Sequence, residues 1–282
     1  MPSTAAPIRA KRVLPGFTLS RGTTLLYLTV IVLIPILALI LKGAEIGPER
    51  FWAIVSAPRA LSAFRVTITA AAIATVFNAF YGLLMAWVLV RYQFPGRRLL
   101  DALMDVPFAL PTAVAGLALT ALFSANGWFG APLEAAGIQV VYTMAGIVLA
   151  MTFTSVPFVV RTVQPVLEDL DPALEQAAVT LGARPWTVFA RVIFPAILPA
   201  VLAGCTLAFA RSLGEFGAIV FIAGNLPFET EIASLLAFIR LEEFDYLGAA
   251  AIALVLLAFA LVLLMVSSLL QGWAARHREA TK

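Results

Sequence analysis

Hydrophobic residues along this chain gather into six long runs that are separated by shorter polar stretches. Each run comes close to the roughly 20 residues that a helix needs to cross a bilayer. The pattern predicts six membrane-spanning helices, at residues 23–41, 66–90, 103–123, 140–160, 197–222 and 247–270. We therefore expect an all-α, polytopic membrane protein, with one membrane domain at 23–270, a polar segment at 1–22 and a tail at 271–282.

The third run is broken by two prolines, Pro107 and Pro111. Proline removes a backbone donor, and membrane helices tolerate it where a neighbouring helix or a cavity satisfies the freed carbonyl groups. These two residues are therefore candidates for a gate or a wall of a translocation path.

The fifth run carries two charged residues, Arg211 and Glu215, with Gly214 and Phe216 beside Glu215. A charge at the centre of a membrane helix costs roughly 2.5–3.5 kcal/mol even on the permissive insertion scale. If the run is one helix, residues four apart lie on the same face and partly neutralise each other. That face either borders a translocation path or a partner, or holds a structural ion pair within the bundle.

A polar connection at 161–196 lies between the fourth and fifth runs. Asp171 and Pro172 suit the N-cap and first turn of a short helix, and Gly182 suits the left-handed residue that ends one. We expect a second short helix with Trp186 on its inner face, closed by Pro195. A helix–turn–helix between two membrane spans has no use facing lipid, which indicates a docking element.

Composition and charge narrow the class further. Hydrophobic residues make up 62% of the chain, charged residues 12%, and the mean hydropathy is +0.98, against about 25% charged in soluble domains. The chain has one histidine, one cysteine and no glycine-rich phosphate loop, so we expect no enzymatic activity, no metal and no cofactor of its own. The basic residues are dispersed and the net charge is only +3, which gives nucleic-acid binding no support.

The distribution of basic residues predicts how the chain sits in the membrane. Six spans place both termini on one side, and that side holds thirteen Lys and Arg against five on the other. The positive-inside rule therefore places both termini and the polar connection in the cytoplasm. We also expect the first span to be retained, because residues 42–45 form a poor signal-peptide cleavage site.

The polar connection resembles the coupling loop of permease subunits of bacterial ABC importers. That loop has a glutamate, two alanines, a glycine and a later hydrophobic–proline step, which are met here by Glu175, Ala177, Ala178, Gly182 and Ile193-Phe194-Pro195. Phe194 departs from the usual leucine. The resemblance implies a site, including Trp186, that docks a separate ATPase. The alternative is an ordinary cytoplasmic loop that contains a helical hairpin.

Residues 210–217, 221–227 and 230–233 are similar to the oxyanion branch of these permeases, and specifically to the T-type permeases for sulfate and thiosulfate. This resemblance implies an inner-membrane chain that works with a homologous W-type permease, an ATPase dimer that binds ATP–Mg, and a periplasmic sulfate-binding protein. Permeases for molybdate or tungstate remain an alternative. A self-contained secondary anion transporter or channel is another, although the chain shows no convincing internal repeat. An intramembrane enzyme lacks the necessary residues.

Overall fold

The computed structural model describes residues 17–280, and helices are the only regular structure in that part of the chain. Residues 1–16 of the predicted N-terminal segment and 281–282 of the predicted tail lie outside it. The helices are α1 (Phe17–Leu28), η1 (Thr29–Leu33, a π-helical segment), α2 (Ile34–Ala44), α3 (Pro48–Val55), α4 (Pro58–Arg91), α5 (Arg97–Met104), α6 (Val106–Ala109), α7 (Thr112–Phe123), α8 (Gly130–Ala135), α9 (Met144–Glu168), α10 (Pro172–Thr180), α11 (Pro185–Val188), η2 (Phe189–Ile193, also π-helical), α12 (Phe194–Leu213), α13 (Ile219–Ile222), α14 (Ala233–Glu242) and α15 (Tyr246–Ala280).

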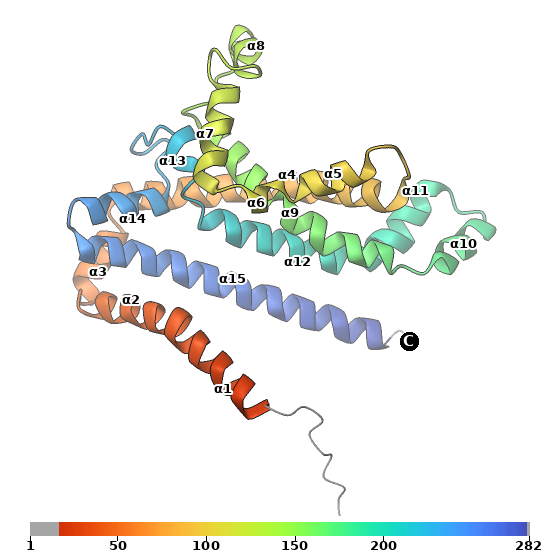
Figure 1. Cartoon of the computed structure of the whole chain (residues 1–282), viewed down its shortest axis with the longest axis horizontal. Coiled ribbons are helices and arrows are strands. Elements are labelled where there is room, and N and C mark those ends of the chain that lie inside the picture. Colours follow the sequence, from red (N-terminus) through yellow and green to blue (C-terminus); the bar gives the residue numbers. More distant parts are fainter. Residues whose placement is uncertain (1–16, 281–282) are drawn as a thin grey trace, which may run out of the picture.

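Four long helices, α4, α9, α12 and α15, run side by side and form the bundle (Figure 1). One end of it carries α3, α13 and α14, and we call this the α14 end. The opposite end carries α5, α10 and α11, and we call it the α10 end. Helices α1 and α2 run as a separate arm that meets the bundle along α15, and α7 with α8 projects to the side of the bundle.

Small residues let the central helices approach closely, as expected for helices packed within a membrane. Gly82 of α4 and Gly204 of α12 both face Val159 of α9. A Cβ atom at Gly82 would lie 2.8 Å from the Val159 Cβ, and one at Gly204 would lie 2.9 Å from its Cα. Helix α9 is therefore fixed between α4 and α12, and it forms the centre of the bundle.

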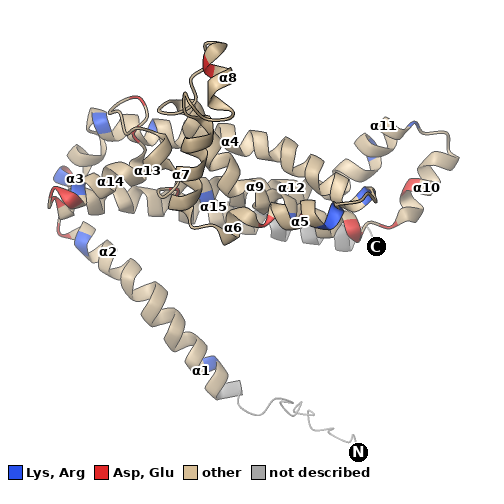
Figure 2. Ribbon diagram, turned by 45° about the horizontal axis from the view of Figure 1, so that its top comes forward, with Lys and Arg blue, Asp and Glu red and all other residues tan. Residues whose placement is uncertain are grey.

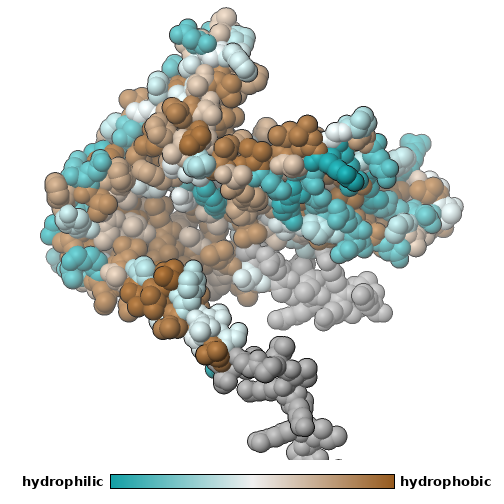
Figure 3. Space-filling model, in the orientation of Figure 1, coloured by the Kyte–Doolittle hydropathy of each residue, from teal (hydrophilic) through white to brown (hydrophobic). Residues whose placement is uncertain are grey.

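Five helices in the described part are long and apolar enough to cross a membrane, by length and composition. They are Leu19–Ala44, Pro58–Arg91, Met144–Glu168, Pro185–Leu213 and Tyr246–Val266. Charged residues gather at both ends of the bundle, and the visible face is hydrophobic over α2 and much of the bundle's middle (Figures 2 and 3). Five of the six predicted runs thus correspond to long apolar helices, and the count of six crossings stays a prediction.

The third run is broken, as its prolines predict. Helix α5 ends at Met104, α6 is a single turn that contains Pro107, and α7 begins after Pro111. Helix α7 has 12 residues, which at 1.5 Å each gives about 18 Å and is shorter than the roughly 30 Å hydrocarbon core. This segment is therefore divided into three short helices, of which α5 and α6 contact α9 and α7 projects to the side of the bundle.

The predicted end of the fourth span at Arg161 is wrong, because α9 continues to Glu168. Val163 and Leu167 in the additional turns are buried, which stabilises them as helix. Arg161 need not leave the helix to reach water, since acidic side chains of α5 and its end pair with it.

The predicted boundaries around the fifth span are also wrong. Pro195 does not close a short helix, because Pro185–Leu213 is helical throughout. The π-helical turn η2 ends at Ile193, two residues before Pro195, and the Phe194 amide that follows it donates to the Phe189 carbonyl, five residues back. The widened turn accommodates a proline that cannot donate to a carbonyl. The helix then ends at Leu213, so Glu215 lies beyond its C-cap, Gly214.

Candidate functional site

The connection between α9 and η2 forms a projecting surface at the α10 end. The Asp171 side chain accepts a hydrogen bond of 2.9 Å from the Ala173 amide and so caps α10. Gly182, between α10 and α11, has a φ of +81°, which favours glycine. No residue of α10 is buried, and Leu181 and Trp186 are 88% and 74% exposed. The surface therefore presents apolar side chains outward with little of its own core.

Glu175, on α10, forms an ion pair with Arg91 at the end of α4. The Arg91 guanidinium also lies over the Trp87 ring, with its central carbon 5.2 Å from the ring centroid. Trp87 meets Phe189 edge-on at 5.4 Å, and Phe189 stacks on Trp186 at 5.5 Å. One end of α4 thus holds both halves of the projecting surface, α10 through a charge and α11 through aromatic rings.

The other predicted residues of this surface have different surroundings. Ala177 is exposed, and Ala178 packs against the buried cluster that contains Leu167 and Val188. Pro195 is exposed but lies within the continuous helix, away from the turn at Gly182. The structure therefore brings Glu175 and Trp186 to the end of α4, packs Ala178 on the buried cluster and leaves Pro195 within the long helix.

Arg211 and Glu215 form an ion pair of 2.7 Å between Nη1 and Oε2. The Glu215 side chain is only 1% exposed, whereas that of Arg211 is 32% exposed. Glu215 Oε1 accepts a hydrogen bond from the Ala218 amide, and the Glu215 carbonyl accepts one from the Ser234 hydroxyl. Glu215 therefore fixes the turn after α12, and Arg211 keeps part of its guanidinium accessible. Because Glu215 lies outside the helix, the prediction of one shared helix face is wrong, although the ion pair itself is present.

Phe216 lies in the same turn, with its ring 5.0 Å from that of Phe238 on α14. Gly217 meets the start of α7, since a Cβ there would lie 2.2 Å from Thr112 Oγ1. Pro111 directly precedes Thr112, so the structure brings the Pro111 break beside the turn that carries Glu215. Pro107 lies apart from it in α6, where the neighbouring Phe108 contacts Phe158 of α9.

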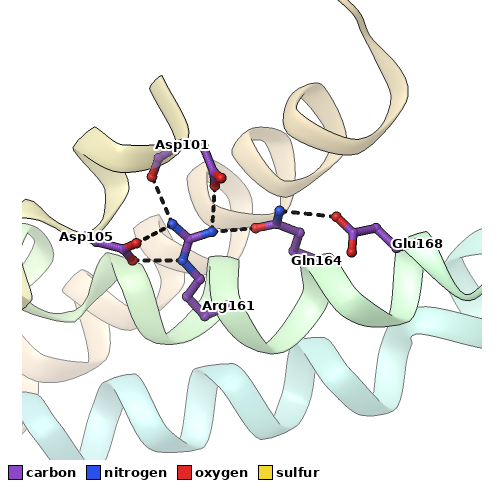
Figure 4. Close-up of polar contacts among 5 residues, drawn as sticks. All are labelled: Asp101, Asp105, Arg161, Gln164 and Glu168. Carbon is purple, nitrogen blue, oxygen red and sulfur yellow. Dashed lines mark hydrogen bonds and ion pairs between the residues drawn. The ribbon is translucent and has the colours of Figure 1, made fainter. Parts of the chain in front are cut away.

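A polar network around Arg161 was not predicted from the sequence. Figure 4 shows the Arg161 guanidinium between Asp101 and Asp105, with Gln164 and Glu168 following along α9. The acids precede Arg161 by 60 and 56 residues. The only signal was the acids themselves, Asp101 in α5 and Asp105 at its C-cap, which lies inside the predicted third run, and neither acid indicated its partner.

A second ion pair that the sequence did not predict lies at the α14 end. Arg59, in the first turn of α4, binds both carboxylate oxygens of Glu231, at 2.9 Å from Nε and 2.6 Å from Nη2. Glu231 is 1% exposed and Arg59 33%. Nearby, the Thr67 hydroxyl accepts a hydrogen bond from the first amide of α14, that of Ala233. The start of α4 therefore holds the segment that leads into α14.

Comparison with known proteins identifies the family of this chain. Residues 78–279 match the model of a family described as "Binding-protein-dependent transport system inner membrane component". The chain belongs to this family. It is thus a membrane-embedded component of an inner-membrane transport system that depends on a binding protein.

Individual relatives are similar along almost the whole chain. The sulfate transport system permease protein CysT of Escherichia coli K12 is 55% identical over 270 residues, which cover 96% of this chain and 98% of the relative. The protein of the same name from Synechocystis is 48% identical over 90% of this chain and 89% of the relative. A solved bacterial alginate ABC transporter in complex with a periplasmic protein has a chain with the same fold, at a TM-score of 0.73 and 16% identity, covering 89% of this chain and 93% of that one.

Proposed function

We propose that this chain is the T-type permease subunit of an ATP-driven importer of sulfate and thiosulfate. The observation that carries the proposal is the 55% identity to a sulfate permease across 96% of the chain. The fold is consistent with the proposal, since a chain of a solved alginate ABC transporter in complex with a periplasmic protein has the same fold. The chain forms half of the translocation path, and a homologous W-type permease forms the other half.

ATP hydrolysis belongs to a separate ATPase dimer in this proposal. The chain has no glycine-rich phosphate loop, so it binds no nucleotide by that means, and ATP–Mg is held by the partner. A periplasmic sulfate-binding protein delivers the anion. The chain itself contributes no catalytic residue and no cofactor.

The projecting surface formed by α10 and α11 is the part that docks the ATPase. Its exposed apolar residues, Leu181 and Trp186, project beyond the bundle, and an apolar anchor with a polar surround is typical of a protein interface. Glu175 contributes by its pair with Arg91, which ties α10 to the membrane helix α4. A displacement of α10 by the ATPase is therefore passed directly to α4.

The path passes the turn after α12. Arg211 is partly exposed and its charge is offset by Glu215, which suits weak binding of a passing dianion better than an unpaired arginine does. Gly214 and Phe216 flank Glu215, and Pro111 reaches the same turn through α7. Pro107, in the α6 break, contributes farther along the same segment.

Both termini and the α10 end face the cytoplasm. The excess of basic residues on that side of the predicted topology supports this orientation. Reporter fusions give the test. One placed at Arg184 should report a cytoplasmic location and one at Glu229 a periplasmic location, and a cytoplasmic signal at Glu229 would overturn the topology.

Uptake of radiolabelled sulfate by cells that lack the chain, with and without a plasmid that restores it, tests the transport function. We expect uptake to return with the plasmid, and unlabelled thiosulfate to compete with it. Restored uptake of molybdate or tungstate in place of sulfate would assign the chain to the alternative oxyanion. Uptake that persists when the ATPase subunit is deleted would instead indicate a self-contained transporter.

A further inference from the structure

The third membrane segment has a break in its backbone between α5 and α6, at Asp105. In a continuous helix the Asp105 amide would donate to the Asp101 carbonyl, four residues earlier. Here it donates to the Ala102 carbonyl at 3.1 Å, which leaves the Asp101 carbonyl without its usual partner. Pro107 follows two residues later and has no amide hydrogen. A break of this kind must be satisfied by other groups of the protein if it is to persist beside a membrane.

Arg161 of α9 supplies the missing donors. Its Nη2 donates to the Asp101 carbonyl at 2.8 Å and to Asp105 Oδ2 at 2.7 Å, while Nε donates to Asp105 Oδ1 at 2.8 Å. Its Nη1 donates to Asp101 Oδ1 at 2.6 Å and to Gln164 Oε1 at 2.7 Å. These bonds use all five donors of the guanidinium, and they hold the carbonyl and both carboxylates at the break.

A second residue of α9 holds the other side of the break. Phe158 lies three residues before Arg161, hence on the same face of α9. Its ring meets that of Phe108, in α6, edge-on with centroids 5.2 Å apart. The broken segment is therefore attached to α9 on both sides of Asp105, by an aromatic contact at α6 and by the arginine at α5.

The network continues from Arg161 toward the projecting surface, which begins with α10. Gln164 accepts from Arg161 and donates to Glu168 Oε1 at 3.2 Å. Glu168 is the last residue of α9, and α10 begins four residues later. One polar row on α9 therefore joins the break in the third segment to the base of the projecting surface (Figure 4).

Exposure separates a stabilising role from a positioning role. The Arg161 side chain is 30% exposed, and those of Asp101 and Asp105 are 42% and 52% exposed. Ion pairs this exposed add little to folding stability on average, although bidentate geometry and networks are the exceptions that fix an orientation. Arg161 has both features, so its contribution lies in the direction of α5 and α6.

We propose that Arg161 is a positioning residue for transport, which holds the α5–α6 break against α9 and so links movement of the α10 surface to the third membrane segment. The inference rests on the proposed function, because it needs an ATPase that moves α10. Without this link the ATPase still docks and hydrolyses ATP, but less sulfate moves per ATP.

The experiment uses the complete importer in proteoliposomes, with its sister permease, ATPase and binding protein. ATP hydrolysis and sulfate uptake are measured together, per assembled complex. Arg161→Gln should lower the sulfate moved per ATP by about tenfold or more, since bonds between charged groups are lost. Arg161→Lys keeps the charge but lacks the planar fork, so it should fall between that variant and the wild type. Asp105→Asn should also lower the ratio.

Arg98→Gln is the matched control. Arg98 is an exposed arginine of the same α5 helix that makes no ion pair within residues 17–280, and its ratio should equal that of the wild type. If Arg161→Gln fails to assemble, Arg161→Lys and Asp105→Asn decide. A wild-type ratio in both would overturn the positioning role. An importer whose wild type moves no sulfate would instead refute the proposed function, so the two failures are distinct.

Discussion

The two ends of the bundle pair their charges in different ways. At the α14 end two paired acids, Glu215 and Glu231, are each 1% exposed, and only Asp245, the partner of Arg240, is more accessible among the arginine-paired acids there, at 33%. At the α10 end no arginine-paired acid in the described residues is buried, with Glu175 23% exposed and Asp105 52%. The arginine partners at both ends are exposed to similar degrees, from 25% to 34%. The two ends therefore differ in the exposure of their acids.

A buried carboxylate fixes the backbone around it, because it cannot be left without its partners. Glu215 holds the turn between α12 and α13 in one arrangement, and Glu231 holds the segment that leads into α14. The accessible acids of the α10 end keep water as an alternative partner, so the loss of one of their contacts costs less folding stability than at a buried acid. The α14 end is thus the locked part of the bundle, and the α10 end is the part that can respond to a docking partner.

Removal of Arg59 should give the largest effect and would sharpen this comparison. Arg59→Gln leaves the Glu231 carboxylate buried without a countercharge, which typically costs about 3–5 kcal/mol. We expect a large loss of assembled complex and a lower thermal unfolding temperature in detergent. The control is Lys42→Gln, which removes an exposed pair, Lys42–Glu45, and should change stability by less than about 1 kcal/mol. Equal effects of the two changes would contradict a locked α14 end.

Sequence patterns predicted most of the elements but few of the partners. Run lengths located the long apolar helices, and the prolines located the breaks on either side of α6. Both signals are local, since they depend on solvent preference and on the missing proline amide. The ends of α9 and α12 were missed because tertiary contacts decide them. Arg161 lies within α9 because Asp101 of α5 and Asp105 at the end of α5 pair with it.

The candidate sites show the same division. The spacing from Glu175 to Gly182 could be recognised in the sequence, and the four-residue spacing of Arg211 and Glu215 predicted their ion pair. The Glu175 partner, Arg91, lies 84 residues away, and the Glu231 partner, Arg59, lies 172 residues away. One sequence carries no signal for such pairs, because either residue alone resembles any charge at a helix end.

The Arg211–Glu215 pair, also at the α14 end, gives a second prediction, in which the two single substitutions differ in the size of their effect. Arg211→Gln leaves a buried carboxylate uncompensated and should cost about 3–5 kcal/mol. Glu215→Gln keeps an oxygen for the Ala218 amide and leaves a partly exposed arginine that water can solvate, so about 1 kcal/mol is expected. Complex yield and sulfate uptake per complex measure the two effects separately.

The charge swap at this pair should not restore either property. An arginine at position 215 would lie in the buried turn, and it offers the Ala218 amide no acceptor. Restored assembly in the swapped variant would show that the pair acts only through its two charges, whichever way round, and that the buried acid does not lock the turn.

The smallest expected effect tests the α10 end, at Gly182. Its φ of +81° strains any residue with a Cβ, and nothing lies within 4 Å of the position that the Cβ would take, so the backbone alone sets the cost. A left-handed conformation costs roughly 1–2 kcal/mol for most residues, and a β-branched one suffers most. Because 1–2 kcal/mol corresponds to about 5- to 30-fold in an equilibrium, Gly182→Val should weaken ATPase binding by that factor.

The stability of the bundle should change little, because no residue of α10 is fully buried and only Ala178 packs against a buried cluster. Gly182→Val should therefore leave the thermal unfolding temperature of the permease unchanged while ATPase pull-down falls. Gly182→Asn is the control, since asparagine adopts left-handed backbone more readily and should bind close to normally. If valine lowers the unfolding temperature as much as Arg59→Gln does, the α10 end is locked like the α14 end. If ATPase binding is untouched by valine, the projecting surface is not where the ATPase docks.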